Sequence, residues 1–225
     1  ADAQLGAGRV LLDGVAFRIG RWWQPPRPND LARAGAVRLA GAADAVRRVV
    51  AQPLDVAGRD ALAQLAHVLA GDGDPAHLAG PVGLLLGRGV GLTPVGDDVL
   101  AGMLVTLRAL AHPAADRLAG RVRAAAPRAT TVVSAALLHH AARGECVPQL
   151  ASLLNAIAHG GRIDRPLDAL LQVGRTSGAG LAWGVAAALD TSARSADDTA
   201  VGSHDDLATP SHPVADGPPR GRIAR

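Results

Sequence analysis

The sequence predicts a predominantly helical α+β protein, in which a small N-terminal β-rich segment packs on a C-terminal helical domain. Three observations predict this fold class. The 225 residues include no Tyr and one Phe, and the 48% hydrophobic content comes largely from Ala, Leu and Val, which suits packed helices better than a β-sandwich. Apolar residues recur at intervals of three and four from about Leu31 onward. Before that point, two short apolar segments flank an Asp-Gly pair.

The N-terminal segment contains a predicted β-hairpin. Its strands are expected at residues 9–12 and 15–19, because the Asp-Gly pair between them favours a type I′ turn. Such a hairpin buries too little to be stable alone, so we expect its apolar face to dock on the helices or to pair with further strands. The Trp-Trp pair that follows is expected at that junction. We assign residues 1–30 to this segment.

The helical domain is expected over residues 31–190, with glycine and proline marking the helix ends. The periodicity predicts helices at 41–52, 58–70, 95–111, 114–125, 130–143, 148–159, 165–173 and 177–189. Residues 191–225 are rich in Ser, Thr, Asp, Gly and Pro and are expected to form a disordered or surface-draped tail. The acidic stretch 71–75 lacks the downstream glutamate of a calcium loop and is interpreted as a turn.

Composition excludes several chemistries. All 23 basic residues are arginines, so a lysine Schiff base and a Walker-type lysine are excluded. The single cysteine, Cys146, rules out an internal disulfide and fits a reducing compartment, which we expect to be the cytoplasm. The arginines are scattered without interleaved aromatic residues, and the apolar runs are too short to span a membrane. We therefore expect neither a nucleic-acid nor a membrane partner.

The most informative motif is the glycine-rich stretch 87–98, GRGVGLTPVGDD. Its glycines allow a ligand to approach backbone N–H groups directly. Thr93 is expected as the N-cap and Pro94 as the first residue of a helix whose positive dipole end faces the loop. This arrangement predicts an anion site. The residues assigned to substrate binding in this loop are Arg88, Gly89 and Gly91.

A second helix start, residues 174–178, has the same residue types, GRTSG. If the two starts meet, Arg88 and Arg175 would face one anion from two sides. The hydroxyls of Thr93, Thr176 and Ser177 would donate hydrogen bonds to it. The alternative is that both are ordinary capped helix starts. We assign catalytic roles to Thr93 and Arg175, and substrate binding to Thr176, Ser177 and Gly178.

Two adjacent carboxylates follow the first loop. Asp97 and Asp98 point in different directions on a helix, so one is expected to brace the loop. The other would face the ligand as a base, a hydrogen-bond acceptor or a Mg²⁺ ligand. We assign the catalytic role to Asp97.

The next helix start carries hydroxyls at Thr131 and Ser134, which either satisfy the helix end or bind substrate in the same pocket. We assign both to substrate binding. His139 and His140 lie within that helix without a further histidine at metal-ligand spacing, so no metal is expected. A catalytic set of Cys146 with His and Asp stays open, although no spacing positions a base beside the thiol.

Three blocks of this sequence resemble a known bacterial family. They are residues 89–98, the hydroxyl-bearing residues of 130–134, and residues 174–178. The family includes AllH, a subunit of oxamate carbamoyltransferase, and the resemblance covers about residues 80–190. It implies a β-rich N-terminal part, a helical C-terminal part and a link to carbamoyl transfer between carbamoyl phosphate and oxamate in purine-nitrogen catabolism.

We therefore expect a carbamoyltransferase, or a subunit of one, that binds its anionic substrate at glycine-rich helix N-termini. The reaction requires no cofactor and no metal, and other protein subunits are expected as partners. One alternative is a non-catalytic subunit that binds a phosphate-bearing metabolite and stabilises or regulates an enzyme. Another is a Mg²⁺-dependent hydrolase that uses Asp97 and Asp98.

Overall fold

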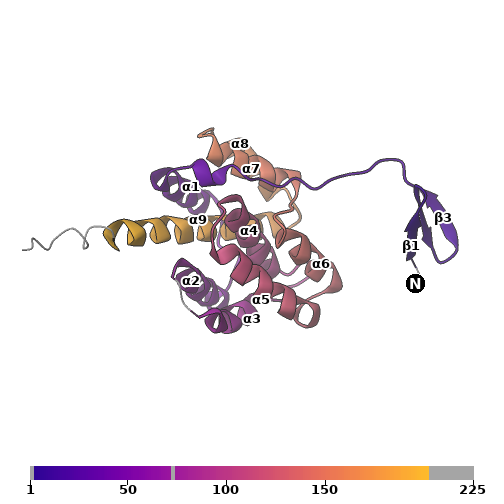
Figure 1. The fold of residues 1–225 in the computed structure, drawn as a ribbon, viewed down its shortest axis with the longest axis horizontal. Coiled ribbons are helices and arrows are strands. Elements are labelled where there is room, and N and C mark those ends of the chain that lie inside the picture. Colours follow the sequence, from indigo (N-terminus) through magenta and orange to yellow (C-terminus); the bar gives the residue numbers. More distant parts are fainter. Residues whose placement is uncertain (1–2, 72–73, 203–225) are drawn as a thin grey trace, which may run out of the picture.

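The computed structural model describes residues 3–71 and 74–202. This part of the chain holds three short strands followed by helices, which confirms a predominantly helical α+β fold (Figure 1). The elements are β1 (Ala3–Gly6), β2 (Arg9–Leu12), β3 (Val15–Arg18), η1 (Leu31–Arg33), α1 (Ala36–Val49), α2 (Val56–Ala70), η2 (Pro75–Leu78), α3 (Ala79–Leu85), α4 (Val95–Ala109), α5 (Ala114–Ala129), α6 (Val132–Ala141), α7 (Pro148–Ala158), α8 (Asp164–Leu171) and α9 (Ser177–Gly202).

The strands form one antiparallel sheet in the order β1-β2-β3. The predicted hairpin is confirmed as β2 and β3, and its turn residues Asp13 and Gly14 both have positive φ, at 47° and 85°, as a type I′ turn requires. Strand β1 pairs with the other edge of β2 and was not predicted.

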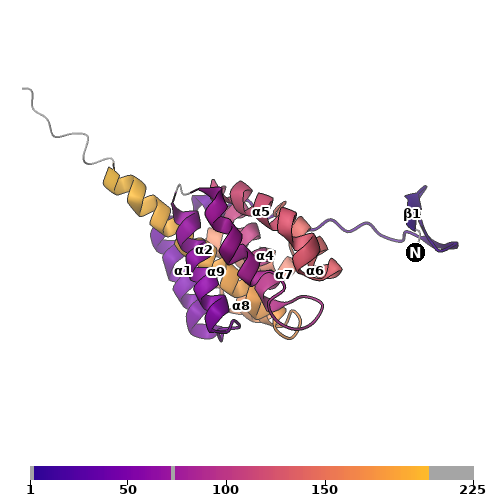
Figure 2. The same cartoon turned by 90° about the horizontal axis from the view of Figure 1, so that it is seen from below.

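The sheet lies apart from the helices in both views (Figures 1 and 2). Its large apolar side chains are exposed, with Leu5 at 68% and Phe17 at 52%. The expected docking of the hairpin on the helices is therefore absent from this structure. The physical reason lies in residues 19–30, which have no regular structure and include three prolines, because proline removes hydrogen-bond donors and keeps such a segment extended.

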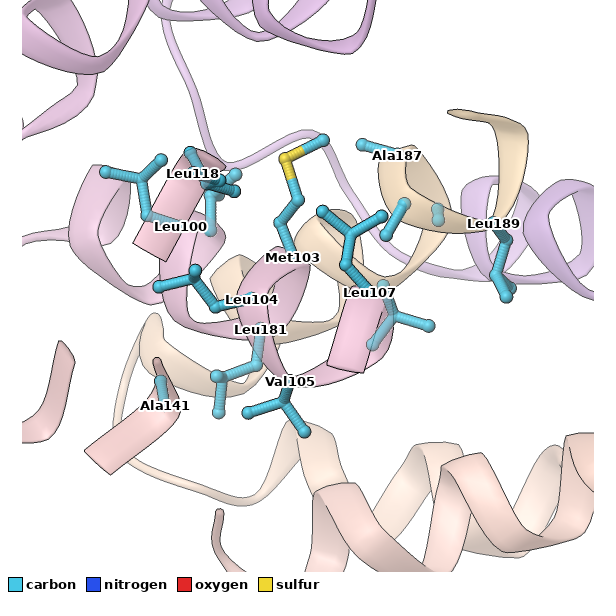
Figure 3. Close-up of a cluster of buried hydrophobic side chains, with 14 of the residues drawn as sticks. Leu100, Met103, Leu104, Val105, Leu107, Leu118, Ala141, Leu181, Ala187 and Leu189 are labelled. Atoms are coloured by element: carbon cyan, nitrogen blue, oxygen red, sulfur yellow. The ribbon is translucent and has the colours of Figure 1, made fainter. Parts of the chain in front are cut away.

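The helical core is centred on the crossing of α4 and α9. Leu100, Met103, Leu104 and Leu107 of α4 are fully buried between neighbouring helices (Figure 3). The two helices approach closely because glycines face the partner backbone. A Cβ on Gly184 would lie 2.1 Å from the carbonyl oxygen of Val99, and one on Gly102 would lie 2.2 Å from that of Leu181. This crossing brings the N-terminal ends of α4 and α9 together.

The largest differences from the predicted helices concern α3 and the end of α9. Helix α3 was not predicted, because the glycines and the proline within its seven residues interrupt the periodic pattern. Helix α9 continues beyond Asp190, so the expected tail begins inside a helix. Buried Thr191 donates its hydroxyl to the Ala187 carbonyl, and the Ser195 hydroxyl donates to the Ala70 carbonyl of α2 at 3.0 Å. Residues 72–73 of the acidic turn and 203–225 of the tail lie outside the described residues.

In the described part of the chain, no helix combines the length and the apolar character needed to cross a bilayer. The core described above is instead built by helices packed on one another, with α4 at the centre.

Candidate functional site

Three helix starts converge on one side of the helical body. The loop of residues 87–94 lies against the start of α6, where the Thr131 hydroxyl donates to the Leu92 carbonyl at 2.5 Å. The same loop meets the start of α9, where the hydroxyl oxygens of Thr93 and Ser177 lie 3.0 Å apart. The two glycine-rich helix starts therefore meet, as a shared site requires.

Asp97 holds these elements together. It is 1% exposed, and its Oδ1 accepts the Gly87 N–H at 2.8 Å. Its Oδ2 accepts the Ser134 hydroxyl at 2.7 Å and also the Thr130 hydroxyl. Gly87 has a φ of +71°, and a Cβ there would lie 2.3 Å from the Ala129 carbonyl oxygen. Because protein donors occupy both of its oxygens, Asp97 braces the loop. This position differs from the ligand-facing one that the sequence analysis assigned to it.

The neighbouring carboxylate, Asp98, faces a cavity of about 480 Å³. Asp98 is 7% exposed, and its Oδ2 has no hydrogen-bond partner among the described residues. Burial raises its pKa to about 7, an effect that the nearby Ser177 hydroxyl opposes and the Asp97 carboxylate reinforces. Such a carboxyl group exchanges a proton near neutral pH, as a catalytic base must. The structure therefore places Asp97 in the brace and Asp98 at the cavity, whereas the sequence analysis assigned the ligand-facing position to Asp97.

Thr93 is not the N-cap of α4. The helix begins at Val95, and the N-cap residue is Pro94, with an extended ψ of 139° and no side-chain cap. The Gly96 N–H donates to the Arg88 carbonyl at 2.9 Å. The loop backbone thus satisfies a free donor of the first turn, which a capping side chain would otherwise bind. The Thr93 hydroxyl is left to line the cavity.

Neither arginine of the predicted anion clamp lines the cavity. Arg88 forms a two-pronged ion pair with Asp55, from Nε to Oδ1 at 2.8 Å and from Nη2 to Oδ2 at 3.0 Å. These hydrogen bonds lower the pKa of Asp55 and raise that of Arg88. Asp55 also caps α2 by accepting the Gly58 N–H. Arg88 therefore ties the loop to α2, which differs from its predicted role. Arg175 is exposed at the start of α9.

The other predicted binding residues of the two glycine-rich helix starts are either exposed or have their backbone donor occupied. Gly89 and Gly91 are exposed, and their φ values are +115° and +98°. Thr176 is exposed as well. Gly178 is buried, and its N–H donates to the Val173 carbonyl at 2.8 Å, so this donor is occupied.

The hydroxyl groups of Thr131 and Ser134, at the start of α6, form hydrogen bonds within the protein. Thr131 caps the helix by accepting the Ser134 N–H at 3.0 Å. Ser134 is buried and donates its hydroxyl to Asp97. Of the two interpretations that the sequence left open, the structure supports the one in which these hydroxyls satisfy local donors and acceptors.

The cavity lining includes two polar regions, one at the N-terminal ends of α4 and α9 and one at the C-terminal end of α6. One region consists of Asp98, Thr93 and Ser177, and the other includes His140 and Glu145. Helices α4, α6, α7 and α9 contribute to the lining, together with the extended segment before η1. The apolar lining residues are Trp23, Pro25, Ala101, Val105, Leu137, Ala141, Val147, Leu150, Val173 and Leu181. Apolar walls with a few polar groups are typical of small-molecule sites.

The second polar region is a charged cluster around Glu145. This carboxylate is 5% exposed and accepts hydrogen bonds from Arg143 Nη2 at 2.8 Å, from His140 Nδ1 at 2.5 Å and from Arg27. The contacts with Arg143, His140 and Arg27, in that order, lower the pKa of Glu145 to about 2. Because a carboxylate only accepts, Nδ1 of His140 carries the hydrogen and leaves Nε2 for another partner.

Sequence reasoning did not assign Asp98, His140 or Glu145 to the site. The available signals were the Asp-Asp pair itself and the fact that Glu145 is the only glutamate in the chain. Arg27 comes from the extended segment, 118 residues before Glu145, and no local sequence pattern predicts that they pair.

Cys146 lines the same cavity. Burial raises the pKa of its thiol to about 12, which keeps the thiol protonated and makes it a poor nucleophile at neutral pH. The interpretation of Cys146 as a catalytic nucleophile is therefore not favoured. Over residues 3–71 and 74–202, no three His, Cys, Asp or Glu side chains are grouped as a metal site would require.

The fold and the site define a predominantly helical protein in which three helix starts rich in hydroxyl groups and glycine meet beside a largely apolar cavity that Asp98 and Glu145 also line. Residues 85–189 match the family model described as oxamate carbamoyltransferase subunit AllH. This match confirms the resemblance stated from the sequence blocks, and the matched segment contains all three helix starts. No solved structure matches the chain.

Proposed function

We propose that this chain takes part in carbamoyl transfer between carbamoyl phosphate and the nitrogen of a small acid such as oxamate, as one subunit of a carbamoyltransferase. The observation that carries the proposal is the buried Asp98 carboxylate, which lines the cavity together with Thr93 and Ser177 of two family blocks and whose Oδ2 has no hydrogen-bond partner among the described residues. The family description supports the reaction and the presence of other subunits. The cavity supports the proposed location of the substrate-binding site in this chain.

In the proposed reaction, the acceptor nitrogen attacks the carbamoyl carbon. The bond between that carbon and the phosphate oxygen breaks, phosphate leaves with the electron pair, and the acceptor nitrogen loses a proton. Asp98 is the proposed base for this proton, because its pKa of about 7 leaves a large ionised fraction at neutral pH. The hydroxyls of Thr93 and Ser177 are the proposed donors to the carbamoyl oxygen.

The phosphate group is proposed to bind on the rim of the cavity. Arg175 and the Thr176 hydroxyl are exposed at the start of α9, two residues and one residue before cavity-lining Ser177. The positive dipole end of α9 favours an anion there, although the Gly178 N–H is already occupied by the Val173 carbonyl. The backbone of Gly89 and Gly91 in the neighbouring loop is exposed beside it.

A second candidate is a binding subunit that holds these ligands while a partner chain performs the reaction. The observation that favours it is that Arg88, one half of the predicted clamp, is engaged by Asp55. In this case the isolated chain binds carbamoyl phosphate without turnover. The hydrolase alternative is weakened because protein donors occupy both oxygens of Asp97.

Ligand-dependent melting of the purified chain tests the proposal. Carbamoyl phosphate and oxamate are expected to raise the melting temperature, since a ligand that binds only the folded state stabilises it. Asp98→Asn is expected to reduce the rise with both ligands, and Arg175→Ala the rise with carbamoyl phosphate and with phosphate. Arg88→Ala is the matched control and is expected to keep the full rise.

The outcomes separate the candidates. A rise that depends on Asp98, followed by carbamoyl transfer in the presence of candidate partner subunits, supports the proposed reaction. Binding with the same dependence but with no transfer under any pairing supports the binding subunit. A response to Mg²⁺ alone, or a carbamoyl phosphate response that is equal in wild type and Asp98→Asn, contradicts the proposal.

A further inference from the structure

The polar region around His140 and Glu145 has no role in the proposed proton transfer. It nevertheless lines the same cavity as Asp98. Ser134, near the start of α6, contacts Asp97 beside Asp98, and His140 follows six residues later, about 9 Å further along the helix. Glu145 orients His140 through Nδ1 at 2.5 Å, so that Nε2 is not used by this ion pair. A carboxylate that fixes one imidazole nitrogen leaves the other to bind or to exchange a proton.

The charge balance of this region favours an anion. Two guanidinium groups, Arg27 and Arg143, pair with one carboxylate, Glu145, so the cluster has a net positive charge before His140 is counted. Neither arginine lines the cavity, so this charge acts from behind Glu145 and His140. A protonated His140 would add a second positive charge and an Nε2–H donor. At the other region, the unpartnered Asp98 oxygen requires a hydrogen-bond donor.

The size and the lining of the cavity accommodate an acid larger than oxamate. A volume of about 480 Å³ lies in the range of sites for drug-sized molecules. Most of the side chains that face it are apolar, including Val105, Leu137 and Leu181. A ligand that fills this space gains free energy by burying an apolar body against these walls.

We infer that the acid accepted here carries an apolar body between a nitrogen-bearing end, which donates to Asp98, and a carboxylate, which binds at His140. The substrate class is thus an amino or amide acid longer and more apolar than oxamate. Carbamoylation of such an amino acid gives a ureido acid, and carbamoylation of such an amide acid gives an acylurea. This inference rests on the proposed function and names the acceptor for the same site.

Binding of ureidohexanoate to the full chain, measured by isothermal titration, tests the inference. Hexanoate lacks the ureido group and pentylurea lacks the carboxylate, while each keeps the hydrocarbon body. We expect ureidohexanoate to bind about tenfold or more tightly than either control compound, because only it satisfies both polar regions. Leu137→Ser, at a half-exposed wall position, is expected to weaken all three compounds.

Two variants test which polar region of the cavity binds which end of the ligand. His140→Ala is expected to weaken ureidohexanoate about tenfold and to leave pentylurea unchanged. Asp98→Asn is expected to weaken pentylurea and to leave hexanoate unchanged. His139→Ala is the matched control, because the neighbouring imidazole does not line this cavity, and it is expected to bind all compounds as the wild type does.

Equal affinity for ureidohexanoate and hexanoate, loss of binding in His139→Ala equal to that in His140→Ala, or no binding of ureidohexanoate would overturn the inference. Its failure is distinguishable from failure of the proposed function. If oxamate and carbamoyl phosphate bind with dependence on Asp98 while ureidohexanoate does not, only the inference fails. If ureidohexanoate binds as expected and carbamoyl phosphate does not, the assigned reaction fails while the two-ended cavity stands.

Discussion

Neutralising Asp98 changes how the stability of this protein depends on pH. In the folded state, burial raises the pKa of Asp98 to about 7 from the ordinary value of 3.8. The folded protein therefore binds this proton more tightly than the unfolded chain does. The stability associated with Asp98 is fully present below about pH 4 and is lost as the pH rises to about 7.

The size of this effect follows from the two pKa values. The difference between about 7 and 3.8, at about 1.4 kcal/mol per pH unit, corresponds to about 4 kcal/mol of unfolding free energy. Asp98→Asn keeps the shape of the side chain and has no proton to lose. Relative to wild type, the variant is expected to gain stability progressively between pH 4 and pH 7 and to keep a constant advantage above that range.

Urea unfolding at a series of pH values measures this difference directly. Ser177→Ala should move the upper end of the pH-dependent range above 7, since the Ser177 hydroxyl lowers the pKa of Asp98. Asp55→Asn is the control of opposite sign, because the Asp55 pKa is lowered by Arg88 and its contribution is lost as the pH falls. Parallel stability curves for wild type and Asp98→Asn would refute the argument.

Three further predictions concern the brace, the helix crossing and the thiol. Asp97→Asn should destabilise the protein by roughly 2–3 kcal/mol in denaturant unfolding, because an amide cannot accept all three donors that the carboxylate accepts; a loss below roughly 0.5 kcal/mol would contradict this role. Gly184→Ala should lower the free energy of unfolding by roughly 1–3 kcal/mol or more, because the new Cβ would meet the Val99 carbonyl. Gly120→Ala, on the open surface of α5, is the control and should be neutral or stabilising. Equal effects of the two substitutions would disprove the close crossing of α4 and α9. Cys146 should react with a disulfide reagent more slowly than a thiol of pKa 9.0. Its pKa of about 12 lowers the thiolate fraction about a thousandfold, and the greater nucleophilicity of a more basic thiolate offsets only part of that loss. Rapid labelling of folded protein would show that the thiol is accessible and ionised.

Local rules determined much of the fold. The Asp13-Gly14 turn has the positive φ values that its residue types predict, and the apolar periodicity located α4, α7 and the start of α9 to within a few residues. These features depend on neighbours in the sequence, where turn chemistry and helical spacing act directly. The three family blocks were also recognisable without a structure.

The tertiary structure decided which of those residues face the cavity. Adjacent carboxylates on a helix must point in different directions, so the sequence indicated one brace and one free group. Only the packing of α6 and α9 against α4 determines that Asp97 receives three donors while Asp98 keeps an unpartnered oxygen. A residue's role depends here on groups that approach from distant parts of the chain.

Contacts between distant parts of the chain also explain which groups the arginines bind. Arg88 pairs with Asp55, 33 residues away, and Arg27 pairs with Glu145, 118 residues away. Residue types predicted that guanidinium groups would bind anions, and they do so, but the anions are carboxylates of this chain. Sequence by itself determined the local elements and the set of polar groups; packing alone decided which are satisfied within the protein and which are left for a ligand.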